Sequence, residues 1–458
     1  MTECGTAVPG DPSPGEALYN ESALDVNNDG TPDETDEACE DVFDISHEKT
    51  LLSIVQQTDG SYCATYNIEV TNGGSEPGFY DLYDLPQYDS DFTILSASYS
   101  SSVHPNIILT PLNPTGLGWQ LGDDISIAAS AAHTYVLVVC VNLDLEDGMT
   151  ADAGDDVYTA CGENGAGPDG MPGEGLYNES SLDTNDDGTP DAQDEACGDV
   201  PYFTLEKDFV GYMQIGPRSW TVEYSIEVCN IGGADGTYDL LDTPCFDDDV
   251  EIDAVRYTTD TPANAGNPGP TTLIGQGPWT LGNGEVLAPA ACHNYSLFVD
   301  VTMDLINENS QGDESYTACG EGGVATGSDG EGVYNKSTLD TNDDGVADIT
   351  DDACGDLPSI SHEKNLTDIT QTGPTSWEVE YTIVVTNDGG ATGTYGLTDD
   401  TAFDDDVVIT CANYTSDANI LHGSMVTFLL FIIFISFIYI IIRFVYGKKV
   451  FYLLLVYF

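Results

Sequence analysis

An acidic segment occurs three times in the chain, at 25–36, 183–194 and 340–351. In each copy, oxygen-bearing side chains occupy positions 1, 3, 5, 9 and 12, and glycine occupies position 6. This spacing is typical of a loop that surrounds a hard cation with oxygen ligands, and the glycine permits the sharp bend that such a loop needs. With a backbone carbonyl at position 7, the pattern predicts three Ca2+ sites. The predicted ligands are Asp25, Asn27, Asp29, Thr31, Asp33 and Asp36; Asp183, Asn185, Asp187, Thr189, Asp191 and Asp194; and Asp340, Asn342, Asp344, Val346, Asp348 and Asp351.

Two cysteines bracket each acidic segment. We expect each pair to form a disulfide that closes the cation loop, which implies an oxidising, extracytoplasmic compartment. The alternative is a set of reduced, buried thiols in a cytosolic protein. The predicted pairs are Cys4–Cys39, Cys161–Cys197 and Cys319–Cys354. The sequence leaves open the pairing of Cys63, Cys140, Cys229, Cys245, Cys292 and Cys411.

The repeat extends well beyond the acidic segments. Tyr19-Asn-Glu-Ser returns at Tyr177 and, as Tyr-Asn-Lys-Ser, at Tyr334. The distance in sequence between successive copies of this motif is far longer than a solenoid repeat and is typical of whole-domain duplication. Short stretches of two-residue alternation separated by Gly and Pro turns, without a sustained helical period, predict an all-β fold of antiparallel β-sandwiches. The clearest predicted strands are 62–70, 135–141, 220–228, 295–301 and 377–385.

The strand pattern has a resemblance to a known family. His47-Glu-Lys49, a Trp- or Tyr-led alternating strand, an Asn-x-Gly-Gly type of turn and Tyr-Asp-Leu-x-Asp at 80–84 and 238–242 together resemble the DUF11-type immunoglobulin-like repeats of bacterial surface proteins. The acidic segments, each followed by a cysteine, are similar to the calcium loops of thrombospondin type 3 and dockerin modules. The two resemblances cover about nine tenths of the chain. They imply tandem immunoglobulin-like antiparallel β-sandwiches joined by calcium-binding loops.

One departure from the EF-hand separates these segments from a calcium sensor. Position 12 carries Asp rather than the longer Glu, and no amphipathic helices flank the segments. The segments are therefore not expected to form a sensor that opens a helix pair. The predicted division of the chain is calcium loop 1 with a truncated junction (1–42), β-sandwich 1 (43–160), calcium loop 2 (161–200), β-sandwich 2 (201–318), calcium loop 3 (319–357) and an incomplete β-sandwich 3 (358–417).

The C-terminal segment has a different composition. Residues 426–442 are uncharged and almost wholly apolar, long enough to span a hydrocarbon core as a helix. Basic residues follow at Arg443, Lys448 and Lys449, so a single-pass anchor would place the C-terminus inside and the repeats outside. The alternative is an artefact of the gene model.

The third sandwich is expected to remain open, because it lacks the residues that close the second.

The charge of the chain excludes one class of partner. Nine Lys and Arg stand against 80 Asp and Glu, which gives a formal net charge of -71. Nucleic acid is excluded, since phosphate binding needs Lys and Arg. Bound calcium would offset part of the self-repulsion, although a halophile would use the same acidic surface for solvation. The acidic clusters 246–249 and 403–406 are predicted to be solvated turns, with further cation sites as the alternative.

Three of the few lysines, Lys49, Lys207 and Lys364, share one position in the repeat. We expect each to form an ion pair with a neighbouring carboxylate. The alternative is an isopeptide bond, as in surface-protein domains with a similarly placed lysine. The matching asparagines in the sequence would be Asn72, Asn230 and Asn387.

The predicted function is structural rather than enzymatic. The sequence contains no phosphate-binding loop, no nucleophile elbow and no zinc-ligand spacing. The chain is therefore expected to be a calcium-stabilised spacer or adhesin stalk, extracellular or at the cell surface, that contacts unidentified cell-surface or matrix ligands. Two alternatives are the accessory region of a large secreted enzyme and the surface-layer protein of a halophile.

Overall fold

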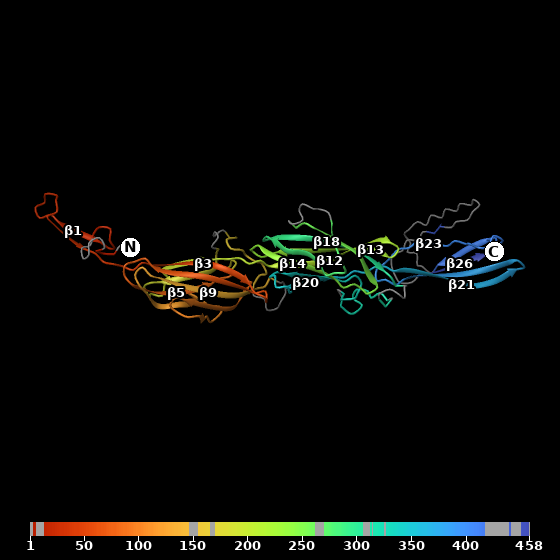
Figure 1. Ribbon diagram of the computed structural model, residues 1–458, viewed down its shortest axis with the longest axis horizontal. Coiled ribbons are helices and arrows are strands. Elements are labelled where there is room, and N and C mark those ends of the chain that lie inside the picture. The colour runs from red at the N-terminus through yellow and green to blue at the C-terminus, as the bar shows by residue number, and fades with distance from the viewer. Residues whose placement is uncertain are drawn as a thin grey trace.

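The computed structural model describes residues 3–5, 13–145, 154–164, 170–261, 270–305, 312–313, 315–324 and 327–416, together with the backbone of 439–440 and 450–457. All regular elements in these ranges are β-strands, and every strand pair is antiparallel. Three strand-rich bodies follow one another along the longest axis (Figure 1). The prediction of an all-β chain of antiparallel sheets is therefore confirmed.

The first sandwich is formed by a five-stranded sheet, β3-β4-β9-β6-β7, and a four-stranded sheet, β8-β5-β10-β11. Buried side chains from both sheets form one core. The strand bounds are β3 Ile45–Gln56, β4 Tyr62–Asn72, β5 Gly78–Pro86, β6 Phe92–Ser101, β7 Ile107–Ile108, β8 Trp119–Ile127, β9 Ala132–Leu143, β10 Asn178–Asp183 and β11 Ala192–Ala196.

The second sandwich repeats this topology strand for strand. Its sheets are β12-β13-β18-β15-β16 and β17-β14-β19-β20. The strand bounds are β12 Phe203–Gly216, β13 Ser219–Asn230, β14 Gly236–Pro244, β15 Val250–Thr259, β16 Thr271–Leu273, β17 Trp279–Leu287, β18 Ala291–Met303, β19 Asn335–Asp340 and β20 Ile349–Ala353.

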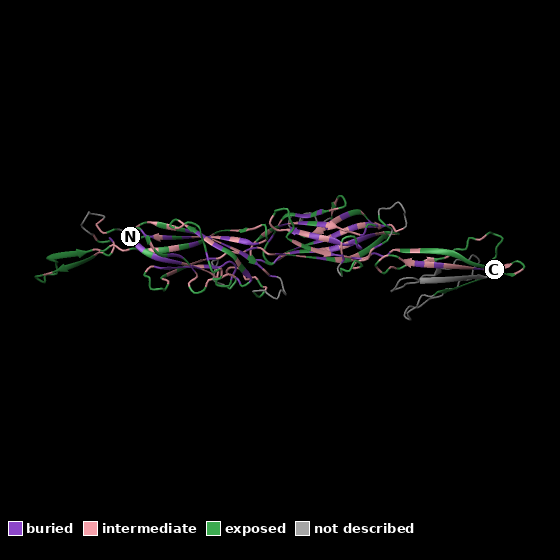
Figure 2. Ribbon diagram, turned by 90° about the horizontal axis from the view of Figure 1, so that it is seen from below, coloured by how far each residue is buried: buried purple, intermediate pink, exposed green. Residues whose placement is uncertain are grey.

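The cores follow the alternation in the sequence. On β4, Tyr66, Ile68 and Val70 are fully buried, while the residues between them face outward or lie at intermediate depth. Because side chains of a strand point alternately to its two faces, one face enters the core and the other meets solvent. Figure 2 shows this banding along the strands of the first two bodies. The predicted core strands of both sandwiches are thus confirmed.

The hairpins that carry the second and third acidic segments are structural strands of the sandwiches rather than linkers. Strand β10 pairs with β5 along its whole length, from Asn178 opposite Pro86 to Asp183 opposite Asp81. Strand β19 pairs with β14 in the same way. The predicted division at 161 and 319 therefore differs from the structure, because each sandwich takes two strands from the chain beyond that boundary.

The first hairpin has a different environment. Strands β1 (Asn20–Leu24) and β2 (Glu34–Ala38) pair with each other and form a two-stranded sheet. All ten of their residues are exposed. Within the described part of the chain, this hairpin has no preceding sandwich to complete.

Five disulfides cross-link the described residues. The three predicted pairs are present, Cys4–Cys39, Cys161–Cys197 and Cys319–Cys354. Two further bonds join neighbouring strands, Cys63–Cys140 between β4 and β9 and Cys229–Cys292 between β13 and β18. Cys245 and Cys411 are free thiols. Five disulfides indicate an oxidising, extracellular environment.

The third body has a smaller core and an unexpected closing strand. Its sheets are β21-β22-β26-β24 and β23-β25. Strand β26 pairs with β22 in the register that β18 adopts on β13, so that Tyr452 is opposite Ile383 as Tyr295 is opposite Ile226. The third sandwich was expected to remain open; β26 adds a strand to its first sheet, and its second sheet contains only β23 and β25 in the described residues. The bounds are β21 Ile360–Gly373, β22 Ser376–Asn387, β23 Leu397–Thr398, β24 Cys411–Ser416, β25 Tyr439–Ile440 and β26 Val450–Tyr457.

The predicted membrane span lies outside the described residues, except for the backbone of the short strand β25. In the part of the chain that the structure describes, no helix is long and apolar enough to cross a bilayer.

The attachment of the second hairpin to the first sandwich can be tested through one hydroxyl group. Tyr66, buried in β4, donates a hydrogen bond of 2.7 Å to the carbonyl oxygen of Leu176, just before β10. Tyr66→Phe should lower the free energy of unfolding by about 1–3 kcal/mol, because a buried carbonyl loses its partner. Urea denaturation of the chain checks this. The Tyr83 hydroxyl makes two long hydrogen bonds, one to Asp81 at 3.4 Å and one from the exposed side-chain amide of Gln120 at 3.3 Å. Tyr83→Phe should therefore stay within about 0.5 kcal/mol of the parent, and an equal effect of both changes would contradict the assignment.

Candidate metal centre

The second acidic segment forms a tight turn between β10 and β11, held by its own carboxylates. Asp183 accepts hydrogen bonds from the backbone N–H groups of Asp186 (2.9 Å) and Gly188 (2.9 Å). Asp187 accepts one from the N–H of Thr189 at 2.8 Å. Asp191 accepts hydrogen bonds from the N–H of Thr184 (2.8 Å) and the side-chain amide of Asn185 (2.9 Å). Positions 1, 3, 5 and 9 of the pattern are therefore brought into one loop.

The first and third segments adopt the same geometry. Asp25 and Asp340 accept the N–H of the glycine at position 6, each at 2.8 Å. The three glycines at this position have φ values of 86°, 77° and 80°, a left-handed conformation that favours glycine. The predicted bend at Gly30, Gly188 and Gly345 is confirmed.

Position 12 does not join the loop. Asp194 lies on β11 opposite Ser180, and its carboxylate accepts the backbone N–H of Lys49 on β3 at 2.5 Å. Asp351 does the same for the N–H of Lys207 at 2.6 Å. Asp36, the third member, lies on β2 opposite Ser22. The structure therefore separates Asp194 and Asp351 from the ligand set that the spacing predicted, because their carboxylates bind the first strand of the sandwich instead.

Hydrogen bonds within the loops lower the pKa of three carboxylates, Asp25, Asp29 and Asp191. The N–H of Gly30 is the largest influence that lowers the pKa of Asp25, and the hydroxyl and N–H of Thr31 lower the pKa of Asp29. Thr184 lowers the pKa of Asp191 in the same way. In contrast, the negative charge of Asp124 raises the pKa of Asp186, since like charges oppose ionisation. The second loop therefore lies in a region of negative charge, which a bound cation would partly neutralise.

The donor set of each loop fits a hard cation in its chemistry. It consists only of carboxylate, amide and carbonyl oxygens, which are the ligands of Ca2+. Among the described residues, no three carboxylates of one loop lie within 4.8 Å of one another; the acidic groups that do are 247–249 and 404–406. The hydrogen bonds described above hold the loop carboxylates in place, and a bound ion would draw them together.

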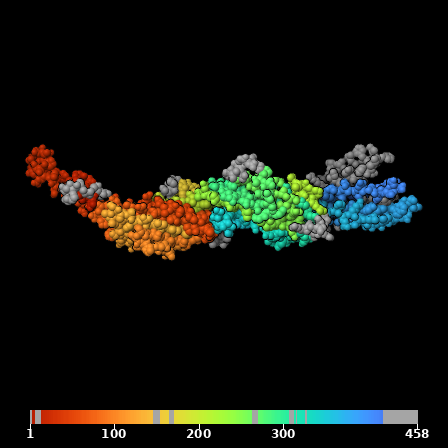
Figure 3. All heavy atoms as spheres, in the orientation of Figure 1, coloured from red at the N-terminus to blue at the C-terminus, as the bar shows by residue number. Residues whose placement is uncertain are grey.

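The third loop lies at the junction between two sandwiches. Gln56, at the end of β3 in the first sandwich, donates a hydrogen bond of 3.3 Å to the hydroxyl of Thr341. That hydroxyl donates to Asp348, at position 9 of the loop, at 2.8 Å. Figure 3 shows the cyan surface of this hairpin between the red-orange first sandwich and the green second one. Sequence reasoning missed Gln56, which is 285 residues from its partner.

A second group of carboxylates is buried where each sandwich leads into the next disulfide loop. Asp247 and Asp249 are 2% and 3% exposed. Asp247 accepts the N–H of Thr317 at 2.8 Å, and Asp249 accepts the N–H of Ser315 at 2.9 Å. The prediction of a solvated turn is therefore wrong for Asp247 and Asp249, which clamp the backbone of the incoming segment. It holds at 404–406, where all three carboxylates are exposed.

The first sandwich has the same clamp, which sequence reasoning missed. Asp89 accepts the N–H of Thr159 at 2.9 Å, and Asp91 accepts the N–H groups of Asp155 and Asp156 at 3.0 and 3.1 Å. The alignment of Asp89-Ser-Asp91 with 247–249 was the available signal. Burial, together with the neighbouring Asp89, raises the pKa of Asp91 to about 6.

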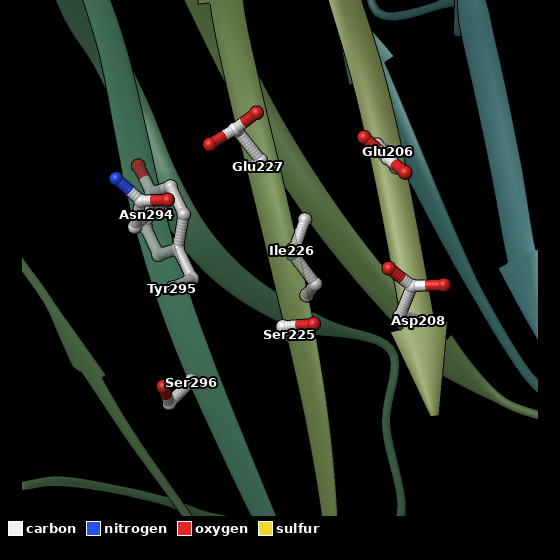
Figure 4. A pocket seen from close by; sticks show the side chains of 8 residues that line it. All are labelled: Glu206, Asp208, Ser225, Ile226, Glu227, Asn294, Tyr295 and Ser296. Atoms are coloured by element: carbon white, nitrogen blue, oxygen red, sulfur yellow. The ribbon is translucent and has the colours of Figure 1, made fainter. Parts of the chain in front are cut away.

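A depression of about 270 Å³ lies on the outer face of the second sandwich. Figure 4 shows Glu206, Asp208 and Glu227 on adjacent strands, with Asn294 on the next strand. Its polar lining is acidic and neutral. The depression contains no histidine, cysteine or lysine among its lining residues.

Comparisons with known proteins give no family. No family model and no curated protein matches the chain. Solved structures that share some of its shape include a calcium-binding mutant of Bacteroides uniformis beta-glucuronidase 2 (12% identity, 64% of this chain, 27% of that chain, TM-score 0.18). Another is Amycolatopsis orientalis exo-chitosanase CsxA (8% identity, 70% of this chain, 28% of that chain, TM-score 0.15). At these scores, the likeness defines neither the type of sandwich nor an activity.

The raised pKa of Asp91 gives a pH-dependent prediction. The folded-state pKa of about 6 lies above the ordinary aspartate pKa of 3.8. Between these two values the unfolded state ionises first, so this group lowers stability as pH rises from about 4 to 6 and has a constant effect above that. In the presence of a chelator, the urea concentration at which half of the protein is unfolded should therefore be the same for Asp91→Asn and the parent near pH 4. Near pH 7.5 this concentration should be higher for Asp91→Asn.

Glu48→Gln serves as the matched control. Glu48 is exposed on β3, and its substitution removes the same charge as Asp91→Asn. A difference between Asp91→Asn and the parent that stays constant from pH 4 to 7.5 would contradict the predicted titration.

Proposed function

We propose that the chain is a calcium-stabilised extracellular repeat protein that acts as a spacer or adhesin stalk. Its sandwiches are immunoglobulin-like in this proposal. Each acidic loop would hold one Ca2+ through positions 1, 3, 5 and 9 and the carbonyl at position 7. In the second loop these are Asp183, Asn185, Asp187, Asp191 and the carbonyl of Thr189.

The position of the third loop carries the proposal. Its hairpin completes the second sandwich through β14, and its tip contacts Gln56 of the first sandwich through Thr341. A cation held by this loop would fix the carboxylates that support that contact. Metal binding would therefore restrict the hinge between two sandwiches, which is what a stiff spacer requires.

The charge of the chain supports the same function. A net charge of -71 makes an extended array repel itself along its length, and this favours an elongated shape. Within one loop, however, carboxylates a few ångströms apart destabilise each other. A divalent cation offsets this local repulsion, while much of the long-range repulsion remains.

Calcium removal should loosen the junction between the first two sandwiches. We expect the full chain to show a defined maximum dimension and slow proteolysis in calcium, and a broader distribution of dimensions with faster cleavage between the sandwiches in chelator. Small-angle scattering and limited proteolysis measure these two properties. Identical scattering curves in the two conditions would overturn the proposal.

Two matched variants separate ion binding from junction stiffness. Asp344→Ala removes the position 5 ligand of the third loop, whereas Asp29→Ala removes the same ligand from the exposed first hairpin. Each should reduce by one the number of ions bound in titration calorimetry. Only Asp344→Ala should make the junction between the first two sandwiches flexible in calcium, because in the described part of the chain Gln56 contacts the third loop and not the first. If both variants kept an equally stiff junction in calcium, calcium binding by the third loop would not be what stiffens the spacer.

A further inference from the structure

Two asparagines are buried without partners in the sandwiches. Asn178 at the start of β10 and Asn335 at the start of β19 are both 0% exposed. Neither amide atom of either side chain has a hydrogen-bond partner among the described residues. A buried primary amide without hydrogen bonds is costly, so the occurrence of two at equivalent positions calls for a reason. Burial also shields both from glycosylation in the folded state, although each begins an Asn-x-Ser motif.

A lysine and an aspartate lie in the same buried region. Lys49 pairs with Asp84, and Lys207 pairs with Asp242, with all four side chains 0% exposed. The ammonium group of Lys49 lies 5.1 Å from the ring centroid of Tyr66. One carboxylate oxygen of each aspartate has no hydrogen-bond partner among the described residues. The expectation of a lysine–carboxylate ion pair is confirmed.

The strand register brings each asparagine to this pair. On β10, Ser180 is opposite Asp84, and Asn178 lies two residues earlier, on the same face of the strand. The amide of Asn178 lies near the Asp84 carboxylate and favours its charged form, which opposes the rise in its pKa, although no hydrogen bond of normal geometry joins the two groups. In the second sandwich, the hydroxyl of Ser337, two residues after Asn335, contacts both Lys207 (3.0 Å) and Asp242 (2.9 Å).

Asn72 and Asn230, the asparagines that the sequence suggested as partners of the lysines, make other contacts. The side-chain oxygen of Asn72 accepts the N–H groups of Asp44 (3.1 Å) and Gly74 (3.0 Å), and its amide nitrogen donates to the carbonyl of Glu76 at 2.8 Å. Asn230 repeats these contacts in the second sandwich. Both stabilise the turn after the strand, so neither is placed for reaction with the lysine.

We propose that each of the first two sandwiches contains an autocatalytic cross-link, an isopeptide bond from Lys49 to Asn178 and from Lys207 to Asn335, formed beside Asp84 and Asp242. The new amide would join the first strand of each sandwich to the hairpin that follows it.

The chemistry is balanced without a co-reactant. The lone pair of the lysine Nζ attacks Cγ of the asparagine amide, and the protonated aspartate donates a hydrogen bond to the amide oxygen. The aspartic acid gives its proton to the leaving amide nitrogen and takes one proton from Nζ in its place. The bond between Cγ and Nδ2 breaks, ammonia leaves, and the bond between Nζ and Cγ remains. The carboxyl group is again protonated, and Nζ keeps the other proton of the neutral amine as the N–H of the new amide.

Burial favours the protonation states that this reaction needs. Burial lowers the pKa of Lys49 and raises the pKa of Asp84. The charge of Asp84 partly offsets the shift of Lys49, and the charge of Lys49 partly offsets the shift of Asp84. Both shifts favour a neutral amine and a neutral acid, because a low-dielectric site disfavours both charges. Lys207 shows the same lowering of its pKa by burial.

The third body provides an internal control. Lys364 pairs with Asp399 at 2.5 Å and lies over Tyr381, as its counterparts lie over Tyr66 and Tyr224. However, β23 pairs with β25 instead of an asparagine-bearing hairpin in the described residues, and the Lys364 side chain is 36% exposed. The third lysine should therefore remain unlinked.

Intact-mass measurement of the full chain tests the proposal. The chain, purified with its disulfides formed and then reduced and denatured, should weigh less than its sequence by two molecules of ammonia. Asn178→Ala and Asn335→Ala should each restore one, and the double variant should restore both. Lys364→Ala should retain both losses. Digestion should release branched peptides that join β3 to β10 and β12 to β19.

A chain with mapped native disulfides and the full sequence mass would overturn the proposal. So would a mass loss that persists in the double variant. Should Asn178→Ala lose the Cys161–Cys197 bond and thus its fold, Asp84→Asn provides the second measurement. With the carboxylic acid gone and the shape kept, it should leave Asn178 unlinked while the Lys207–Asn335 bond still forms. Formation of both bonds in Asp84→Asn would exclude the assigned role of Asp84.

Discussion

The structure depends on the pairing of each sandwich with the hairpin that follows it in the chain. Where β10 lies along β5 and β19 lies along β14, the second sheet has four strands and the apolar core is covered. Without the hairpin, Asp84 and Lys49 would face water, and Leu182 would leave the core. A buried ion pair is favourable only when its remaining polar contacts are supplied, and the hairpin supplies them. Fold, electrostatics and loop position therefore arise from one set of backbone hydrogen bonds.

The same pairing explains which features could be predicted from the sequence. Alternation on β4 and β13 is local, so it revealed the core strands, and the cysteine spacing revealed three disulfides. The partner of β10 was not predictable in this way. Its inward-facing positions hold Asn178 and Ser180, which look like a surface turn in the sequence. Only the long-range register shows that these polar side chains face a buried lysine and aspartate.

Similar reasoning applies to the candidate metal sites. Asp183, Asn185, Asp187 and Asp191 lie in one loop, since these residues are close in the chain, but whether they bind a cation stays a prediction. The spacing failed for Asp194, because a carboxylate on a strand can bind the neighbouring strand instead of the loop. The buried pair Asp89 and Asp91 was overlooked, since a cluster of aspartates has the composition of a solvated turn. The closing strand β26 was hidden for the opposite reason, because its apolar composition resembled the rest of the C-terminal segment.

The disulfide at each junction has a mechanical consequence. Cys161 and Cys197 are bonded directly, so tension applied to the two ends of the chain passes through the sulfur atoms and bypasses the residues between them. Those residues include β10, the acidic loop and β11. Before the proposed Lys–Asn bonds form, a pulled array would load its sandwiches at β3 and β12, and the inserted hairpins would carry no force along their own backbone. The elements that complete each sandwich would then stay seated while the filament is stretched. Once the bonds have formed, tension also enters β10 and β19 through Asn178 and Asn335.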